Sequence, residues 1–86
     1  MPSIARFHGV VIVMYYNEHP PPHLHARYGA NELVVQISPV RVMEGTLSPA
    51  LNRLVLEWVR QHELALLDNW QRAERHERLV RIEAPT

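Results

Sequence analysis

Two histidines and an arginine alternate along one short stretch of the sequence. His23, His25 and Arg27 are separated from one another by single apolar residues. In an extended strand, side chains two positions apart point to the same face, so the two imidazoles would lie about 7 Å apart at Cβ. This spacing suits an acid and a base on either side of one reacting atom, with Arg27 stabilising the charge of a phosphate. The pattern predicts a metal-independent ribonuclease site in which these three residues are catalytic.

The same spacing supports other interpretations. Two imidazoles can share a metal ion, but the chain contains no cysteine, so Glu18, His19, Glu32 or His8 would have to supply the remaining ligands. Complete sites usually display three obvious ligands, and we therefore expect no bound metal and no cofactor. Alternatively, the histidines have no catalytic role and only cap loop carbonyls, meet water or contact a partner.

Residues that precede the histidines are candidates for binding. Tyr15 and Tyr16 end an apolar run, where they could stack on bases or donate hydrogen bonds. His19 opens the proline-rich loop that follows. The sequence contains no Gly-rich phosphate loop, nucleophile elbow or paired-carboxylate motif. The candidate binding residues are therefore Tyr15, Tyr16 and His19.

A small antiparallel sheet is expected to position these residues. Residues 10–16 are β-branched or aromatic and apolar at both parities, which predicts a strand covered on both faces. The consecutive prolines 20–22 must lie in a loop because proline cannot donate to a strand ladder. Residues 40–44 predict a further strand, and residues 79–83 a short final one.

Residues 23–28 and 32–38 alternate on either side of turn residues, which predicts a hairpin. Parity permits a four-residue loop, or a two-residue loop that places Arg27 opposite Glu32. In both registers the histidines and the arginine share a solvent-accessible face. The opposite face, expected to be buried under the helices, consists of Leu24, Ala26 and Tyr28.

The second half of the sequence has helical periodicity. Ser48 and Pro49 are an N-cap and a first helical residue, and Trp58 and Trp70 lie on the apolar stripe. A phase change near residues 61–63 predicts a bend or break. The expected fold class is α+β: a small antiparallel sheet of about four or five strands, with one bent or two short C-terminal helices packed on one face. Residues 1–86 should form a single domain.

Bulk composition narrows the functional classes. The formal net charge is zero, so no global field attracts the chain to nucleic acid or anionic lipid. The sequence has neither a signal-peptide pattern nor an apolar run long enough to cross a bilayer. We expect a cytoplasmic protein that does not associate with membranes.

The apolar character of residues 10–16 also bears on association. One helical segment covers only one face of a strand, so the second face would expose Val11, Val13 and Tyr15, or their neighbours of opposite parity. A patch of this kind marks an interaction surface. The sequence therefore predicts a homodimer or a tight heteromer.

The histidine segment resembles a bacterial family. The pattern His19-x-Pro21-Pro22-His23-x-His25-x-x-Tyr28-Gly29 is similar to that of the domain-of-unknown-function family 4160. Shorter similarities over nearly the whole chain are Met1-Pro2-x-Ile4, Phe7-x-Gly9, Met14-Tyr15, Glu44-Gly45-x-Leu47, Leu56-Glu57-Trp58 and Asn69-Trp70. Such members are often encoded beside a second small protein, and the pair has been proposed to act as toxin and antitoxin. The resemblance implies a cytoplasmic protein with a small protein partner, and supplies no catalytic mechanism.

These observations lead to one expectation and two alternatives. The expected function is the toxin-like component of a bacterial two-gene module, neutralised by an antitoxin-like protein from the neighbouring gene. As an enzyme, it would act on RNA through His23, His25 and Arg27. The alternative is a non-enzymatic module that binds protein or nucleic acid, and a metal-dependent hydrolase is the third possibility.

Overall fold

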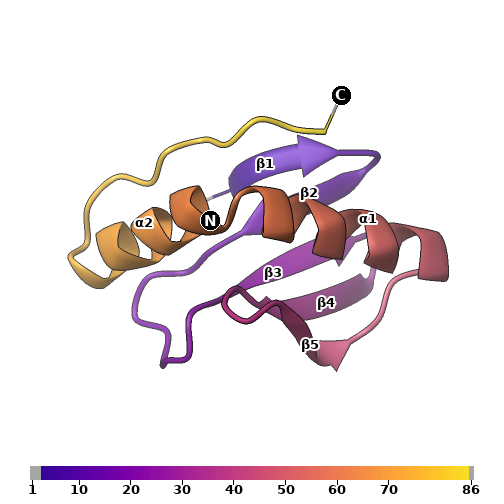
Figure 1. Ribbon diagram of the computed structural model, residues 1–86, viewed down its shortest axis with the longest axis horizontal. Coiled ribbons are helices and arrows are strands. Elements are labelled where there is room, and N and C mark those ends of the chain that lie inside the picture. The colour runs from indigo at the N-terminus through magenta and orange to yellow at the C-terminus, as the bar shows by residue number, and fades with distance from the viewer. Residues whose placement is uncertain (1–2, 86) are drawn as a thin grey trace.

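The computed structural model describes residues 3–85, and its first half is a five-stranded antiparallel sheet (Figure 1). The strands are β1 (Ser3–Phe7), β2 (Val10–Val13), β3 (His23–Tyr28), β4 (Asn31–Gln36) and β5 (Arg41–Gly45), and their order in the sheet follows the chain. With two helices, this sheet confirms the α+β class. The sequence pattern does not predict β1, because a shift in register between Ser3 and Ala5 interrupts the period of two.

Two-residue turns set the register of the sheet. His8 and Gly9, between β1 and β2, have φ values of 50° and 79°, as in a type I′ turn. Between β3 and β4, Gly29 is the first central residue and has a φ of 58°, as in a type II′ turn. This turn places Arg27 opposite Glu32, so the hairpin forms the two-residue register.

Helices α1 (Pro49–Gln61) and α2 (Glu63–Glu74) lie on one face of the sheet (Figure 1). The Ser48 hydroxyl accepts a hydrogen bond from the Leu51 N–H at 3.1 Å, which confirms the predicted N-cap. The predicted break is also confirmed, at His62, whose φ and ψ are −120° and 26°. Within residues 3–85, no helix is both long and apolar enough to span a membrane.

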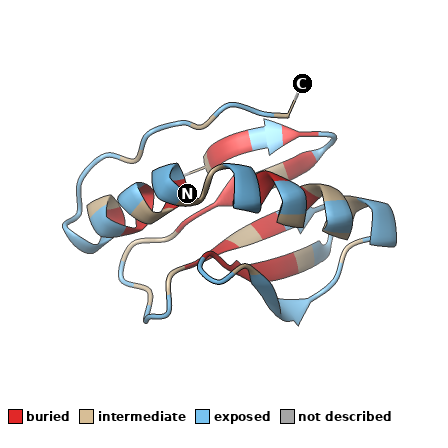
Figure 2. Cartoon of the chain, in the orientation of Figure 1, coloured by how far each residue is buried: buried red, intermediate tan, exposed pale blue. Residues whose placement is uncertain are grey.

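The core lies between the helices and the facing side of the sheet, and Figure 2 shows buried residues along the strands that the helices cover. Leu24 and Ala26 are in this core, and so are Trp58 and Trp70, as predicted. Tyr28 was expected there, but it is 44% exposed, because it is the last residue of β3 and its ring lies beside Gly9 at the adjacent turn. β5 is exposed along its length (Figure 2).

Residues 79–83 form no strand, contrary to the prediction. They run extended beside β1, where the Ile82 N–H donates to the Ile4 carbonyl at 2.8 Å (Figure 1). The Asn69 side chain on α2 bonds both the N–H and the carbonyl of Val80, each at 2.8 Å. A helix side chain therefore satisfies backbone groups that a strand ladder would have used.

Strand pairing puts His25 and Arg27 on the face of the sheet turned away from the helices, as the alternation predicts, whereas His23, the first residue of β3, contacts Trp70 of α2. The expected apolar patch on this face does not form. Val13 is only 1% exposed, and Val11 and Tyr15 are half-buried. The reason is that β2 ends at Val13, after which the loop of residues 14–22 folds back and packs Tyr15 against His25.

Candidate functional site

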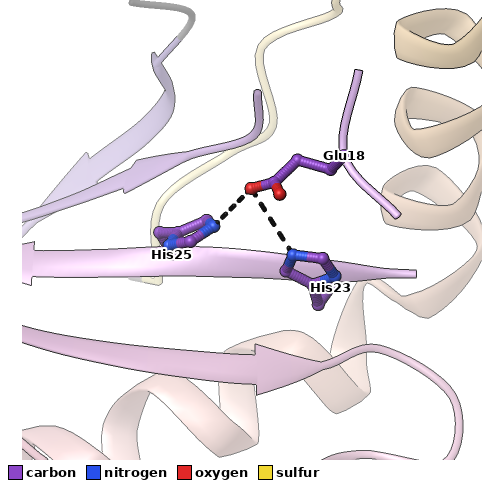
Figure 3. Close-up of side chains that lie close together, drawn as sticks. All are labelled: Glu18, His23 and His25. Atoms are coloured by element: carbon purple, nitrogen blue, oxygen red, sulfur yellow. Dashed lines mark hydrogen bonds and ion pairs between the residues drawn. The ribbon is translucent and has the colours of Figure 1, made fainter. Parts of the chain in front are cut away.

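The loop of residues 14–22 brings a carboxylate to the two histidines. Its proline-rich end is held to the sheet by the Ile37 N–H, which donates to the Pro22 carbonyl at 3.0 Å. Glu18, before the prolines, turns back so that its side chain lies above the first half of β3 (Figure 3). Glu18, His23 and His25 form what we call the histidine–carboxylate cluster.

One carboxylate oxygen joins the cluster (Figure 3). Oε1 of Glu18 lies 2.8 Å from Nε2 of His25 and 3.5 Å from Nε2 of His23. Each of the three residues offers one donor atom. These three atoms lie within 4.8 Å of one another, close enough to surround a single metal ion. In Glu18 and His25, 29% and 16% of the side-chain surface is exposed, so the cluster can be reached from solvent.

His23 is buried, whereas the sequence predicted an accessible side chain. It is 8% exposed because its ring packs against the indole of Trp70, with ring centroids 5.2 Å apart. Its Nδ1 lies 2.7 Å from the Pro21 carbonyl oxygen. A carbonyl only accepts hydrogen bonds, so Nδ1 carries the proton and Nε2 is directed at Glu18. The ring is therefore fixed in both orientation and tautomer.

His25 lies between two acidic residues. Its Nε2 faces Glu18, and its Nδ1 is 3.3 Å from Oε2 of Glu32 on β4. The second contact is within ion-pair distance but lacks hydrogen-bond geometry, and Nδ1 is buried with no hydrogen-bond partner. The edge of the Tyr15 ring packs on the imidazole, with centroids 4.8 Å apart. The sequence analysis placed Tyr15 among the binding candidates, and it does lie next to the cluster.

Arg27 is the exposed member of the predicted site. Its Nε lies 3.9 Å from Glu32, and its guanidinium donates to the Tyr15 hydroxyl at 3.4 Å. Arg27 thus shares Glu32 and Tyr15 with His25, and the two side chains form one continuous polar surface.

The other candidates lie elsewhere. Tyr16 donates to the Glu77 carbonyl at 3.2 Å and stacks on His76. His19 and His8 are exposed, and neither belongs to the group of potential ligands found within residues 3–85. Two acidic residues were candidate metal ligands from the sequence. Glu18 contacts both histidines, whereas Glu32 contacts only Nδ1 of His25.

Two hollows flank the cluster. A cavity of about 240 Å³ lies between the loop and α2, lined by Tyr15, Asn17, Glu18, Trp70, Ala73 and Glu74. On the far face, a shallow groove of about 390 Å³, which we call the arginine groove, is lined by Arg6, Gly9, Val11, Val13, Arg27 and Gly29. The hydrogen bond between Arg27 and Tyr15 connects the two, so a bound chain could contact both hollows and the cluster.

Sequence reasoning did not identify two components of the site. Trp70 was placed in the core, correctly, but its contact with His23 joins residues far apart in the chain. Glu18 was named only as one of several possible ligands, because the conformation of a loop with three prolines has no periodicity that would orient its side chain. The proximity of Glu18 to the prolines and histidines was the only signal.

Comparisons with known proteins give one positive result. A family model described as Domain of unknown function (DUF4160) matches residues 9–71. No curated protein and no solved structure matches the chain. The matched region contains the whole histidine–carboxylate cluster and Arg27, and it covers most of the chain. On this match, the chain belongs to the DUF4160 family.

Proposed function

We propose that the protein acts on RNA as the toxin-like component of a two-protein module, with its reaction centred on the histidine–carboxylate cluster. The observation that carries this proposal is the position of the arginine groove. Two guanidinium groups line a hollow on the same sheet face as His25, and Arg27 contacts residues that also contact His25.

The register of the sheet explains the groove. Arg6 pairs with Val11, and Val11 pairs with Arg27, so the two arginines flank an apolar residue in one row across three strands. Guanidinium groups bind phosphate in two-pronged geometry. His25 lies in the adjacent row, paired with Val13. A backbone whose phosphates bind Arg6 and Arg27 would bring a neighbouring phosphate to His25.

The residues of the site have distinct roles in this proposal. Proton transfer at the reacting phosphate falls to His25 through Nε2, which must first leave Glu18 because Nδ1 is buried beside Glu32, and Arg27 stabilises the charge of the phosphate. His23 is buried and contacts the same Glu18 oxygen, so it positions the carboxylate. The half-exposed Tyr15 ring, which lines the cavity, offers a stacking surface for a base.

The two-protein part of the proposal is supported by family membership and by the accessibility of the groove. The groove and the cluster lie on one face, so a small partner bound there would block RNA from both. This arrangement would explain neutralisation by a protein that need not alter the fold.

Expression in bacteria tests the proposal directly. We expect growth arrest and cleavage of RNA by purified protein, and both should be lost in a His23→Ala/His25→Ala double variant that keeps its far-UV circular dichroism. Arg53→Ala, at an exposed position on α1, is the matched control and should retain both activities. Persistence of arrest and cleavage in the double variant would exclude the cluster as the active site.

RNA binding without cleavage is the second candidate function, and the arginine groove favours it independently. The affinity for single-stranded RNA should then depend on salt, and each phosphate contact removed should reduce the slope of log K against log [salt] by about 0.7. We expect Arg6→Ala/Arg27→Ala to reduce the slope by about 1.4, and Arg53→Ala to leave it unchanged. Equal slopes for the two variants would place RNA elsewhere.

A further inference from the structure

The position of the proton on the neutral His23 ring makes the contact of its other nitrogen with Glu18 unfavourable. Because Nδ1 donates to the Pro21 carbonyl, the Nε2 of a neutral ring has a lone pair. That lone pair faces Oε1 of Glu18 at 3.5 Å in a partly buried site. Two electron-rich atoms repel each other at this distance unless a cation lies between them.

His25 shows the same imbalance. Its two ring nitrogens face the carboxylates of Glu18 and Glu32, at 2.8 and 3.3 Å. A neutral imidazole has a single N–H, so one nitrogen must present a lone pair to a carboxylate. All of these contacts would become favourable if both histidines carried an additional proton. They would also become favourable if His23, His25 and Glu18 shared one divalent cation.

We propose that Glu18 Oε1, His23 Nε2 and His25 Nε2 bind one divalent transition-metal ion. Donor atoms in a tetrahedral zinc site lie about 3.4 Å apart, given bonds of about 2.1 Å. The two contacts to Glu18, at 2.8 and 3.5 Å, bracket this value. The three donor atoms together lie within 4.8 Å of one another, so the two imidazoles would have to move closer together to form the site.

The groups that face the outer nitrogens of both histidines are those expected around metal ligands. A histidine that binds a metal through one nitrogen ordinarily donates its other N–H to a carbonyl or a carboxylate. Nδ1 of His23 has the Pro21 carbonyl, and Nδ1 of His25 has the Glu32 carboxylate. Metal binding at Nε2 would place the His25 proton on Nδ1, the atom that otherwise has no hydrogen-bond partner.

The donor set indicates the class of ion. Two imidazoles favour zinc, iron, cobalt or nickel over magnesium and calcium, which prefer oxygen ligands. Two histidines and one carboxylate also leave coordination positions open, as catalytic sites require. Glu18 lines the 240 Å³ cavity, so an open position could receive water or substrate from there. The ion would supply a metal-activated water for hydrolysis.

This inference goes beyond the proposed action on RNA and rests on side-chain geometry alone. With the ion bound, Nε2 of His25 would be a ligand and could not transfer protons, so the metal-activated water would replace the imidazole as the group that acts at the phosphate. It revises the expectation, drawn from the sequence, that the protein has no metal. The sequence shows only two ligands at a regular spacing, and the third comes from a loop.

Zinc binding by untagged, chelator-treated protein tests the site. Titration in competition with a chromophoric chelator should give one Zn²⁺ per chain. Glu18→Gln keeps the size of the side chain but removes its charge, and His25→Ala removes a ligand, so each should weaken binding by at least about 100-fold, beyond the usual effect of losing an outer hydrogen bond. Glu32→Gln removes only such a bond and should weaken binding about tenfold.

His76→Ala is the matched control, because His76 is an exposed histidine that lies outside the cluster. It should bind Zn²⁺ as the original protein does. Co²⁺ provides an optical check: visible absorption bands should appear with the original protein and be absent with Glu18→Gln. Circular dichroism establishes that each variant is folded.

The proposal is overturned if Glu18→Gln binds Zn²⁺ as tightly as the original protein, or if no stoichiometric binding occurs. The measurement uses no RNA, so its failure leaves the proposed function intact. Conversely, stoichiometric zinc without RNA cleavage would support the metal site and contradict the proposed enzymatic reaction.

Discussion

The Trp58 side chain joins the sheet, the helices and the C-terminal segment. Its ring lies against Phe7 of β1, with centroids 5.2 Å apart, and beside His62 at 5.1 Å. Its indole N–H donates to the Glu83 carbonyl at 2.8 Å. A residue with these contacts supports the fold, and its ring is buried and unavailable for binding RNA.

Replacement of Trp58 by alanine should therefore reduce the free energy of unfolding by about 3–5 kcal/mol, the range for large buried aromatic side chains. Denaturant melts measure the change. Arg60→Ala, at an exposed position on the same helix, should change the free energy by no more than about 0.5 kcal/mol. A loss below about 1 kcal/mol for Trp58→Ala would contradict the packing described above.

At the scale of elements, the end of β5 depends on a glycine. Gly45 has a φ of 76°, and a Cβ atom there would overlap the backbone carbonyl of Glu32 on β4. Gly29 also has a positive φ, 58°, but a Cβ atom there would meet nothing within 4 Å. Both glycines have a backbone conformation that other residues adopt only with strain. They differ in the space available for a side chain.

Gly29→Ala should cost about 1 kcal/mol, the lower end for a residue in an unfavourable backbone region. Gly45→Ala should cost clearly more, because strand β5 must also move away from β4. Thermal melts of the two variants compare these costs. Equal destabilisation would indicate that β5 accommodates the methyl group without moving.

Asn69 fixes another element, the C-terminal segment. It is buried, and both polar atoms of its side chain bond to the backbone of Val80. Asn69→Ala removes both bonds and should cost about 2 kcal/mol, at about 1 kcal/mol for each bond. Hydrogen exchange at Ile82 should become faster, while Gln71→Ala, exposed on the same helix, should leave it unchanged. Unchanged exchange in Asn69→Ala would mean that the contacts with Ile4 and Trp58 hold the segment without Asn69.

At the scale of the whole molecule, the burial of Val13 removes the exposed apolar patch from which the sequence predicted a homodimer or heteromer. The chain covers most of β2 itself, so an open apolar patch no longer requires a homodimer. We still propose a partner, and we place it over the arginine groove, where it would block access to the cluster. Light scattering of the purified chain tests the homodimer independently.

The heteromer is tested by co-expression with the product of the neighbouring gene. The two proteins should co-purify, and Val11→Glu should weaken the complex at least about tenfold, because its carboxylate would pair with Arg6 and Arg27 on either side and change the charge of the groove. Leu64→Glu, at a site on α2 that is 82% exposed, should have no effect. Loss of the complex with Leu64→Glu alone would place the partner on the helices.

The sequence by itself determined the local structure of this protein. Period-two alternation placed Leu24 and Ala26 on the core face and His25 on the opposite one, since successive strand residues must point to opposite faces. Ser48 and Pro49 determined the start of α1. The Ser48 side chain accepts a hydrogen bond from a backbone N–H of the first turn, and Pro49 has no N–H that needs a partner. The break at His62 followed from the change in phase of the apolar stripe.

Only the tertiary structure decided which of these residues meet. Glu18 reaches His23 and His25 because a loop with three prolines folds back on β3, and a proline-rich loop has no periodicity from which to infer a direction. Trp70 buries His23 from a helix that begins 40 residues later in the chain, at Glu63. Residues 79–83 have the sequence pattern of a strand, but the backbone of Val80 bonds to the Asn69 side chain. In each case, the contact depends on long-range packing, which local sequence patterns do not encode.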